Sequence, residues 1–351
     1  MLKRRAAAAI RDAWTSARCV ILTLVLCGCA DPDPYELGDY LTRLSRVLET
    51  EIPAVDQRQV PQMPRVRDVR FESTAVGVDI LEFLRLGECE LQQWIAERNS
   101  SLGRLATDSQ RLVYELNFLR LADVCIQTLA SDHPSLAGDL RKVADQKQQM
   151  LPRLIWQSIL AGPEFRDYWS HRHQHWSDLN ETTVSDALIY LDQQVSRWLA
   201  GHFEVSGEKL ELALSVLRTG DGGTLLHGWR EVASRLTQAN LMIDTRLLSR
   251  PLCYKGMVTP RREVLQRVVT RFTGKVQEGI NQLSESRYEQ ISQIQQLESR
   301  FLDVEPELYR RFRHSRDALL ESAATTPRSH VESLRPLLTQ CELLPGSRTE
   351  A

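Results

Sequence analysis

Apolar residues recur at every third or fourth position along most of the chain, which is the period of an amphipathic α-helix. The pattern predicts helices over residues 38–50, 78–98, 107–119, 183–200, 209–217 and 225–248. A lone strand-like alternation occurs from Val66 to Phe71, and we interpret it as an extended strap. The expected fold is therefore all-α, a bundle-like body of antiparallel helical hairpins.

Caps and prolines set the expected ends of several helices. Thr107 and Gln110 have the spacing of a capping box, in which each side chain bonds the backbone N–H of the other residue. Pro152 is expected to divide residues 136–160 into two shorter helices, because proline lacks the N–H that a helix interior uses. Two separate helices are also predicted over residues 306–322 and 330–338.

The longest pattern begins at Thr259, a capping residue, and Pro260, a favoured first helical residue. One continuous helix from there to Leu302 would be about 60 Å long, so we expect Ser284-Glu285-Ser286 to break it into a hairpin. Because there is no strong linker and no fixed-period repeat, residues 38–345 are predicted to form one domain. The alternative is two lobes that meet near Gly162-Pro163, and residues 346–351 are expected to be a disordered tail.

Composition and charge limit the function. With 42% hydrophobic and 26% charged residues among 351, the chain can bury a core and is neither a low-complexity nor a polytopic membrane protein. Residues 1–28 hold five bases and one acid, so the remaining 323 residues carry 39 bases and 45 acids, a net charge of −6. A body of that charge is not expected to bind nucleic acid through bulk electrostatics.

The N-terminus has the order of a bacterial lipoprotein signal. A basic stretch precedes the apolar run Val20–Leu26, which is too short to span a bilayer. Leu26-Cys27-Gly28-Cys29 then resembles a lipobox, whose last cysteine is acylated and becomes the mature N-terminus. We expect residues 1–28 to be a signal peptide and Cys29 to carry palmitate-type chains. The alternative is a soluble secreted protein, or a cytosolic protein with a chance apolar run.

Acylation of Cys29 would place the body next to a membrane. Two or three acyl chains anchor a protein durably, and the extended chain of residues 29–37 reaches only about 25–30 Å. By analogy with lipoprotein sorting, Ala30 after the cysteine favours the outer membrane over the inner one, although Asp31 weakens that argument. The expected location is lipid-anchored and facing the periplasm.

Four cysteines remain in the body: Cys89, Cys125, Cys253 and Cys341. An even number in an oxidising compartment favours two disulfides, with three pairings open. We favour the sequential pairing, which would join two consecutive helices and tie a loop to the C-terminal segment. A zinc site is disfavoured because no two of these cysteines have Cys-x-x-Cys spacing.

Three segments are candidates for chemistry. The first is a polar cluster that could clamp a ligand, although capping of helix ends is the favoured interpretation. Its members are Glu90, Glu97, Arg98, Asn99, Ser100, Ser101 and Arg104. The second, His171, His173 and His175, could face one metal ion on a strand, but a loop is favoured because no HExxH or flanking strand accompanies it.

The third segment, Tyr309–Arg316, is a basic run that could contact anionic lipid headgroups or cell-wall polymer, with a solvated helix face as the favoured alternative. No motif of a serine hydrolase, nucleotide-binding protein or EF-hand occurs. We therefore predict no catalytic residue, metal or cofactor.

Residues 87–104, together with Ser109–Glu115 and Pro251-Leu252-Cys253, resemble an uncharacterised family of Gram-negative lipoproteins known as a domain of unknown function. The resemblance covers nearly the whole mature chain and is most specific in residues 87–104. It implies an envelope lipoprotein with this cysteine set and assigns no activity. The expected function is non-enzymatic binding or scaffolding of an envelope protein or cell-wall component. The alternative is an enzyme or small-ligand receptor with a pocket around Glu90, Glu97, Arg98 and Asn99.

Overall fold

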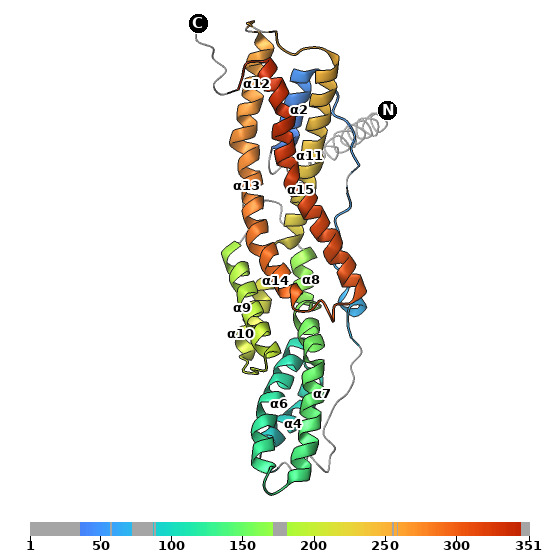
Figure 1. Cartoon of the computed structure of the whole chain (residues 1–351), viewed down its shortest axis with the longest axis vertical. Helices are drawn as coiled ribbons and strands as arrows, with labels where there is room; N and C mark the ends of the chain where they lie inside the picture. The colour runs from blue at the N-terminus through green and yellow to red at the C-terminus, as the bar shows by residue number, and fades with distance from the viewer. Residues whose placement is uncertain are drawn as a thin grey trace, which may run out of the picture. The chain divides into compact units, whose positions relative to one another are not determined.

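The computed structural model describes residues 36–56, 58–71, 87, 89–170, 181–254, 256, 257 and 259–344, apart from the side chains of Leu102, Arg104, Glu181 and Thr182. This part of the chain is helical and contains no strand, which confirms the all-α prediction (Figure 1). None of the helices in these ranges is both long and apolar enough to cross a bilayer. The predicted signal peptide, Cys29 and the three histidines of residues 171–175 lie outside the described residues.

The elements follow one another along the chain with short connections. The α-helices are α2 (Leu37–Leu48), α4 (Glu90–Asn99), α5 (Ser101–Arg104), α6 (Asp108–Leu129), α7 (Pro134–Ile159), α8 (Pro163–Ser170), α9 (Glu181–Leu199), α10 (Gly207–Arg218), α11 (Gly222–Ser249), α12 (Pro260–Arg271), α13 (Gln277–Ser286), α14 (Ser292–Ser299) and α15 (Glu307–Gln340). A 3₁₀ turn, η1, covers Val66–Asp68, and two π-helical turns are η3 (Phe272–Val276) and η4 (Arg287–Ile291).

Antiparallel hairpins form the first part of the described body. The Thr107 hydroxyl accepts from the Gln110 N–H and the Gln110 side chain accepts from the Thr107 N–H, so the predicted capping box begins α6. Helix α6 packs along α7, and the disulfide Cys89–Cys125 ties the start of α4 to α6. The second predicted disulfide, Cys253–Cys341, is also present, which confirms the sequential pairing.

Two predicted helix breaks are wrong. Pro152 lies inside α7, and Pro327 and Pro336 lie inside α15, which runs unbroken through the gap expected between residues 322 and 330. A proline in a helix interior removes one hydrogen bond and crowds the preceding turn. Around Pro152, however, Ile155 and Trp156 are fully buried, and this packing offsets the local cost.

The expected break at Ser284–Ser286 is also wrong. Residues 260–299 form one continuous helix, in which η3 and η4 are wider turns between α12, α13 and α14. The Ser284 hydroxyl donates to the Ile280 carbonyl and the Ser286 hydroxyl to the Gln282 carbonyl, each one turn back. Both serines are therefore satisfied within the helix and do not interrupt it.

The C-terminal part of the body centres on α11 and α15, which pack along each other, with α2 against α11 and α12 (Figure 1). Residues 50–71 return along this assembly largely without helix. Gln238 of α11 donates to the Pro53 carbonyl and Arg58 donates to Ser322 of α15. The strap predicted over Val66–Phe71 is wrong in its first half, because Val66–Asp68 is a 3₁₀ turn and not extended.

Gly220 and Gly222 lie just before and at the start of α11, where they allow the backbone to pack against the Tyr168 ring and do not form a phosphate-binding loop. A Cβ at Gly222 would lie 2.2 Å from Cε1 of Tyr168, and a Cβ at Gly220 would lie 2.5 Å from Cδ2 of the same ring. Tyr168 is fully buried and donates from its hydroxyl to Gln290 at 2.8 Å. Only residues without a Cβ let the start of α11 approach this ring so closely.

Candidate functional site

The polar cluster predicted around residues 90–104 lies at helix ends. Glu90, Glu97 and Asn99 are exposed, as are Ser100 and Ser101. Arg98 donates to the Gly103 carbonyl at 2.9 Å, and the Ser100 hydroxyl accepts from the Gly103 N–H at 3.1 Å. These contacts satisfy the backbone between α4 and α5, as the capping interpretation expects. The side chain of Arg104 is not among those described.

The basic run of residues 309–316 is largely neutralised by its own neighbourhood. Glu305, which is buried, accepts from Arg310 at 3.2 Å and from Arg313 at 2.7 Å. Arg311 pairs with Glu307, and Arg316 is completely buried. This segment is therefore neither an open cationic face for lipid nor a fully solvated one.

Arg316 of α15 and Glu298, near the end of α14, form a buried ion pair between the two helices. Two parallel hydrogen bonds of 2.7 and 2.8 Å join the guanidinium to the carboxylate, and the Tyr309 hydroxyl donates to the same carboxylate. Burial alone would lower the pKa of Arg316, but the charge and hydrogen bonds of Glu298, together with the nearby Tyr309 and Asp317, outweigh burial and raise that pKa above its usual value. The Arg316 guanidinium also lies 5.0 Å from the Trp169 ring centroid. Every charged group here has a partner, so the arrangement is structural.

A second buried polar group joins three helices around His330. Nε2 of His330 lies 2.7 Å from the Tyr40 hydroxyl of α2, and Nδ1 lies 2.6 Å from Oδ1 of Asn240 on α11. Burial lowers the pKa of His330 to about 4, so the ring is neutral at neutral pH. An amide oxygen only accepts, so Nδ1 carries the proton and Nε2 accepts from Tyr40. The π-helical turn η3 places Phe272 against both rings, with centroids 5.0 Å from Tyr40 and 4.9 Å from His330.

The buried histidine predicts a loss of stability in mild acid. In the unfolded chain His330 takes a proton near pH 6.5, the ordinary pKa of a histidine, whereas the folded protein resists protonation until about pH 4. The free energy of unfolding should therefore fall as the pH drops from about 6.5 to about 4, by up to about 3 kcal/mol from this group. Urea denaturation across that range measures the slope, and His330→Leu should flatten it. An equal slope in the variant would contradict the assignment.

A further candidate site is a groove between α2 and α12. The two helices run antiparallel, because Glu36 at the start of α2 pairs with Arg271 at the end of α12, at 2.6 Å. At the other end Glu49, which follows α2, pairs with Arg261 in the first turn of α12. Tyr40, Leu41, Leu44 and Leu48 bury the opposite face of α2 in the core, so the helix keeps its polar face toward this groove.

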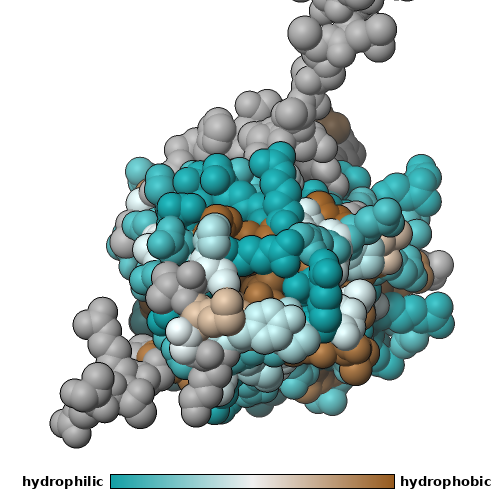
Figure 2. All heavy atoms as spheres, turned by 90° about the horizontal axis from the view of Figure 1, so that it is seen from above, coloured by the Kyte–Doolittle hydropathy of each residue, from teal (hydrophilic) through white to brown (hydrophobic). Residues whose placement is uncertain are grey.

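Arginine side chains line the groove over an apolar floor. The cavity has a volume of about 510 Å³ and its floor includes Val47, Val264 and Val268. Among the described residues its lining holds five arginines and no carboxylate: Arg43, Arg46, Arg261, Arg267 and Arg271. Seen from the end where α12 begins, hydrophilic side chains surround smaller apolar patches on the surface (Figure 2). This groove, which we name the α2–α12 groove, thus combines positive charge with an apolar floor in which Val264 is partly exposed and Val47 and Val268 are buried.

Positive charge exceeds negative charge around the α2–α12 groove. Asp39 is shared by Arg43 at 2.7 Å and Arg271 at 3.0 Å, and Glu49 is shared by several arginines. Arg46 and Arg267 are both exposed, and neither has an ion pair with any carboxylate in the part of the chain that the structure describes. Two guanidiniums of the groove are therefore free to meet an anion.

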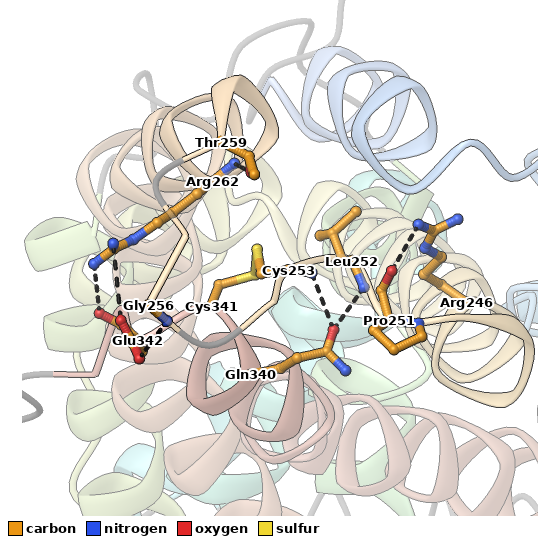
Figure 3. Close-up of a disulfide and its surroundings, with 10 residues drawn as sticks. All are labelled: Arg246, Pro251, Leu252, Cys253, Gly256, Thr259, Arg262, Gln340, Cys341 and Glu342. Atoms are coloured by element: carbon orange, nitrogen blue, oxygen red, sulfur yellow. Dashed lines mark hydrogen bonds and ion pairs between the residues drawn. A yellow bond between two sulfur atoms is a disulfide. The ribbon is translucent and has the colours of Figure 1, made fainter.

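The loop beside the groove is held by a disulfide and by side-chain hydrogen bonds. Cys253–Cys341 joins it to the end of α15, and Oε1 of Gln340 accepts from the N–H of Leu252 at 2.7 Å (Figure 3). Arg246 donates to the Pro251 carbonyl at 3.3 Å in the same view. Burial and the nearby charges of Arg250 and Arg261 lower the pKa of Arg246, which reflects the crowding of cations at this end.

Sequence reasoning missed the groove. Its two walls, α2 and α12, are more than 200 residues apart in the sequence, so no local motif unites them. One signal was available, because four of the twelve residues of α12 are arginine. Among the described residues no group of His, Cys, Asp and Glu side chains is placed to hold a metal ion.

Comparison with known proteins gives one match. The profile of a family described as "Protein of unknown function (DUF3080)" matches residues 37–345 of this sequence. No curated protein and no solved structure matches it. The match spans every helix of the described body, including both walls of the α2–α12 groove and all four disulfide cysteines.

Proposed function

Because the chain belongs to this family of proteins of unknown function, we propose its role from its own residues: a lipid-anchored envelope protein that binds an anionic envelope component. The observation that carries the binding role is the α2–α12 groove, whose lining includes five arginines and, within the described part of the chain, no carboxylate. Guanidinium groups recognise phosphate and carboxylate groups through paired hydrogen bonds. Binding and positioning need no reacting group, so this role fits a site built of arginine and valine.

The proposed anchor is Cys29, and it rests on the lipobox-like sequence that precedes the body. A signal peptide ending at residue 28, acyl chains on Cys29 and a location facing the periplasm belong to the same proposal. The outer membrane is preferred because Ala30 follows the cysteine. The two disulfides support a compartment outside the cytoplasm, since such bonds persist in oxidising surroundings.

The alternative role, an enzyme or small-ligand receptor built on Glu90, Glu97, Arg98 and Asn99, has less support. Three of these side chains are exposed, and Arg98 is used to satisfy the Gly103 carbonyl. A pocket for a small ligand is concave and encloses its polar groups. The cluster offers capping contacts at the end of α4 instead.

Growth with labelled palmitate tests the anchor. The wild-type protein should carry the label, Cys29→Ala should lose it, and Cys27→Ala should keep it, because Cys27 lies in the proposed signal peptide. Full labelling of the Cys29→Ala protein would refute the anchor, and so would an unlabelled wild type.

A photo-reactive amino acid at position 264 tests the binding site. Val264 lies in the groove floor, whereas Val331 is 53% exposed on α15 and does not line the groove, so position 331 is a matched control. After irradiation of intact cells, mass spectrometry should find an adduct at position 264 and none at position 331. The binding role would be wrong if position 264 gave no adduct, or if both positions gave the same one.

A further inference from the structure

We propose that the α2–α12 groove binds the phosphate headgroup of an anionic phospholipid, with the valine floor against the glycerol and the first carbons of its acyl chains. The inference deepens the proposed function and takes from it only the nearness of a membrane. Its geometric basis is one cavity of about 510 Å³ with guanidiniums along its walls and Val47, Val264 and Val268 below them.

The positions of the free cations support a phosphate. Arg46 is on α2 and Arg267 on α12, so the two lining guanidiniums that have no ion pair with a described carboxylate come from opposite walls of one groove. The other arginines of the lining are already engaged: Arg43 and Arg271 by Asp39, and Arg261 by Glu49. A phosphate between Arg46 and Arg267 would supply the missing negative charge without displacing an existing ion pair.

The floor supports an amphiphile over a free anion. A site for inorganic phosphate alone gains nothing from apolar walls, which exclude water without bonding the ion. Here Val264 of α12 is partly exposed within the cavity, whereas Val47 and Val268 are 5% and 4% exposed and form its closed apolar base. A lipid headgroup with its attached hydrocarbon satisfies the arginines and covers this apolar surface at the same time.

The sequence supports a source of lipid within reach. Helix α2 begins at Leu37, only eight residues after Cys29, and an extended chain of that length spans about 25–30 Å. An acylated Cys29 would keep α2, one wall of the groove, within that distance of a bilayer surface. A phospholipid is therefore the phosphate-bearing amphiphile that the groove would meet at the highest local concentration.

The other basic segment, Tyr309–Arg316, is a poorer candidate for lipid binding than the α2–α12 groove. The arginines at 310, 311 and 313 lie on an exposed turn of α15 but are paired with Glu305 or Glu307. They would have to give up these partners to bind lipid. In the α2–α12 groove, Arg46 and Arg267 could bind lipid without giving up an ion pair with a described residue.

The test titrates the full protein, purified from cells in a neutral detergent, with three probes by calorimetry. The probes are short-chain phosphatidylglycerol, phosphatidylcholine with the same chains, and inorganic phosphate. Phosphatidylglycerol should bind at least about tenfold more tightly than either of the other two. Equal binding of phosphate would show a simple anion site, and equal binding of phosphatidylcholine an apolar one, and either result would overturn the proposal.

Variants locate the binding. Arg46→Ala/Arg267→Ala should weaken binding of phosphatidylglycerol by at least about tenfold, because the variant removes two positive charges that attract the anionic headgroup. Neither residue has a carboxylate partner among the described residues, so the double variant should fold normally, which circular dichroism checks. The matched control is Arg120→Ala/Arg328→Ala, which removes two exposed arginines of α6 and α15.

Unchanged binding by the Arg46→Ala/Arg267→Ala protein would place the lipid elsewhere and overturn the proposal, as would an equal loss in the control. The titration takes place in detergent, so its outcome does not depend on acylation of Cys29. A failed palmitate experiment therefore leaves the lipid result readable, and a failed titration leaves the anchor intact.

Discussion

Arg316→Met should lower the free energy of unfolding by about 3–5 kcal/mol, because it leaves a buried carboxylate without its cation. The side chains of Arg316 and Glu298 are 0% and 2% exposed and are joined by two hydrogen bonds, so water cannot replace the lost partner. Methionine keeps most of the apolar stem of the arginine, although it removes the guanidinium that lies over the Trp169 ring. Urea denaturation followed by circular dichroism measures the loss.

A matched arginine on the same helix provides the control. Arg311 pairs with Glu307, but its side chain is 72% exposed, so Arg311→Met should change the free energy of unfolding by less than about 1 kcal/mol. Glu298→Leu/Arg316→Met removes both charges and should be less destabilised than Arg316→Met alone. If the double variant were the less stable one, the stranded charge would not be the cause.

Cys253→Ala/Cys341→Ala should lower the free energy of unfolding by about 4–5 kcal/mol, because this disulfide closes a loop of 88 residues in the unfolded chain. The comparison is Cys89→Ala/Cys125→Ala, whose sequence separation is 36 and whose loss should be smaller by about 0.8 kcal/mol. Denaturation under non-reducing conditions measures both.

The loop at Cys253 is also held by hydrogen bonds, so removal of the disulfide could cost less stability than predicted. Gln340 accepts from the N–H groups of Leu252 and Cys253, at 2.7 and 3.4 Å. If removal of the disulfide cost less than about 2 kcal/mol, these hydrogen bonds and the packing of α15 would be sufficient to hold the loop. The chain-entropy account of this disulfide would then fail.

Local signals in the sequence predicted the helices and their caps well. The capping box at Thr107 and the cap at Thr259 are present because each depends on side chains within three residues. The sequential disulfides were predictable for a related reason, since the helix pattern placed Cys89 and Cys125 in the two arms of one hairpin. Proline was overvalued as a helix breaker, because the burial that outweighs its cost at Pro152 comes from distant segments.

The continuous helix of residues 260–299 shows a second limit of periodicity. Val268, Phe272, Val276 and Ile280 are all buried, although they are separated by successive steps of four residues. In a regular α-helix each such step overshoots one turn by about 40°. The π-helical turn η3 is wider and takes up this drift, so the apolar positions stay on one face. The pattern could predict a helix there, but not the turn that keeps it in register.

The candidate site was the least predictable part. Arg46 and Arg267 become neighbours only after α2 and α12 have packed, and neither carries a motif. Conversely, the polar residues of Glu97–Ser101 are close together in the sequence, but Arg98 and Ser100 form hydrogen bonds with the backbone of Gly103 at a helix end. Clustering along the chain was therefore a weaker guide to a binding surface than charge left unpaired across two helices.

The hydrogen bond between Tyr40 and His330 joins residues 290 positions apart. During synthesis it can therefore form only after the segments between them. Helix α2 is among the first segments of the body to be synthesised, yet part of its packing surface is on α15, among the last. The α6–α7 hairpin needs only neighbouring sequence and can form early. The apolar face of α2 packs mainly on α11 and α12, so it must wait, exposed, until that part of the chain has been synthesised, and its bond to His330 forms later still. This delay makes the nascent chain dependent on protection from aggregation.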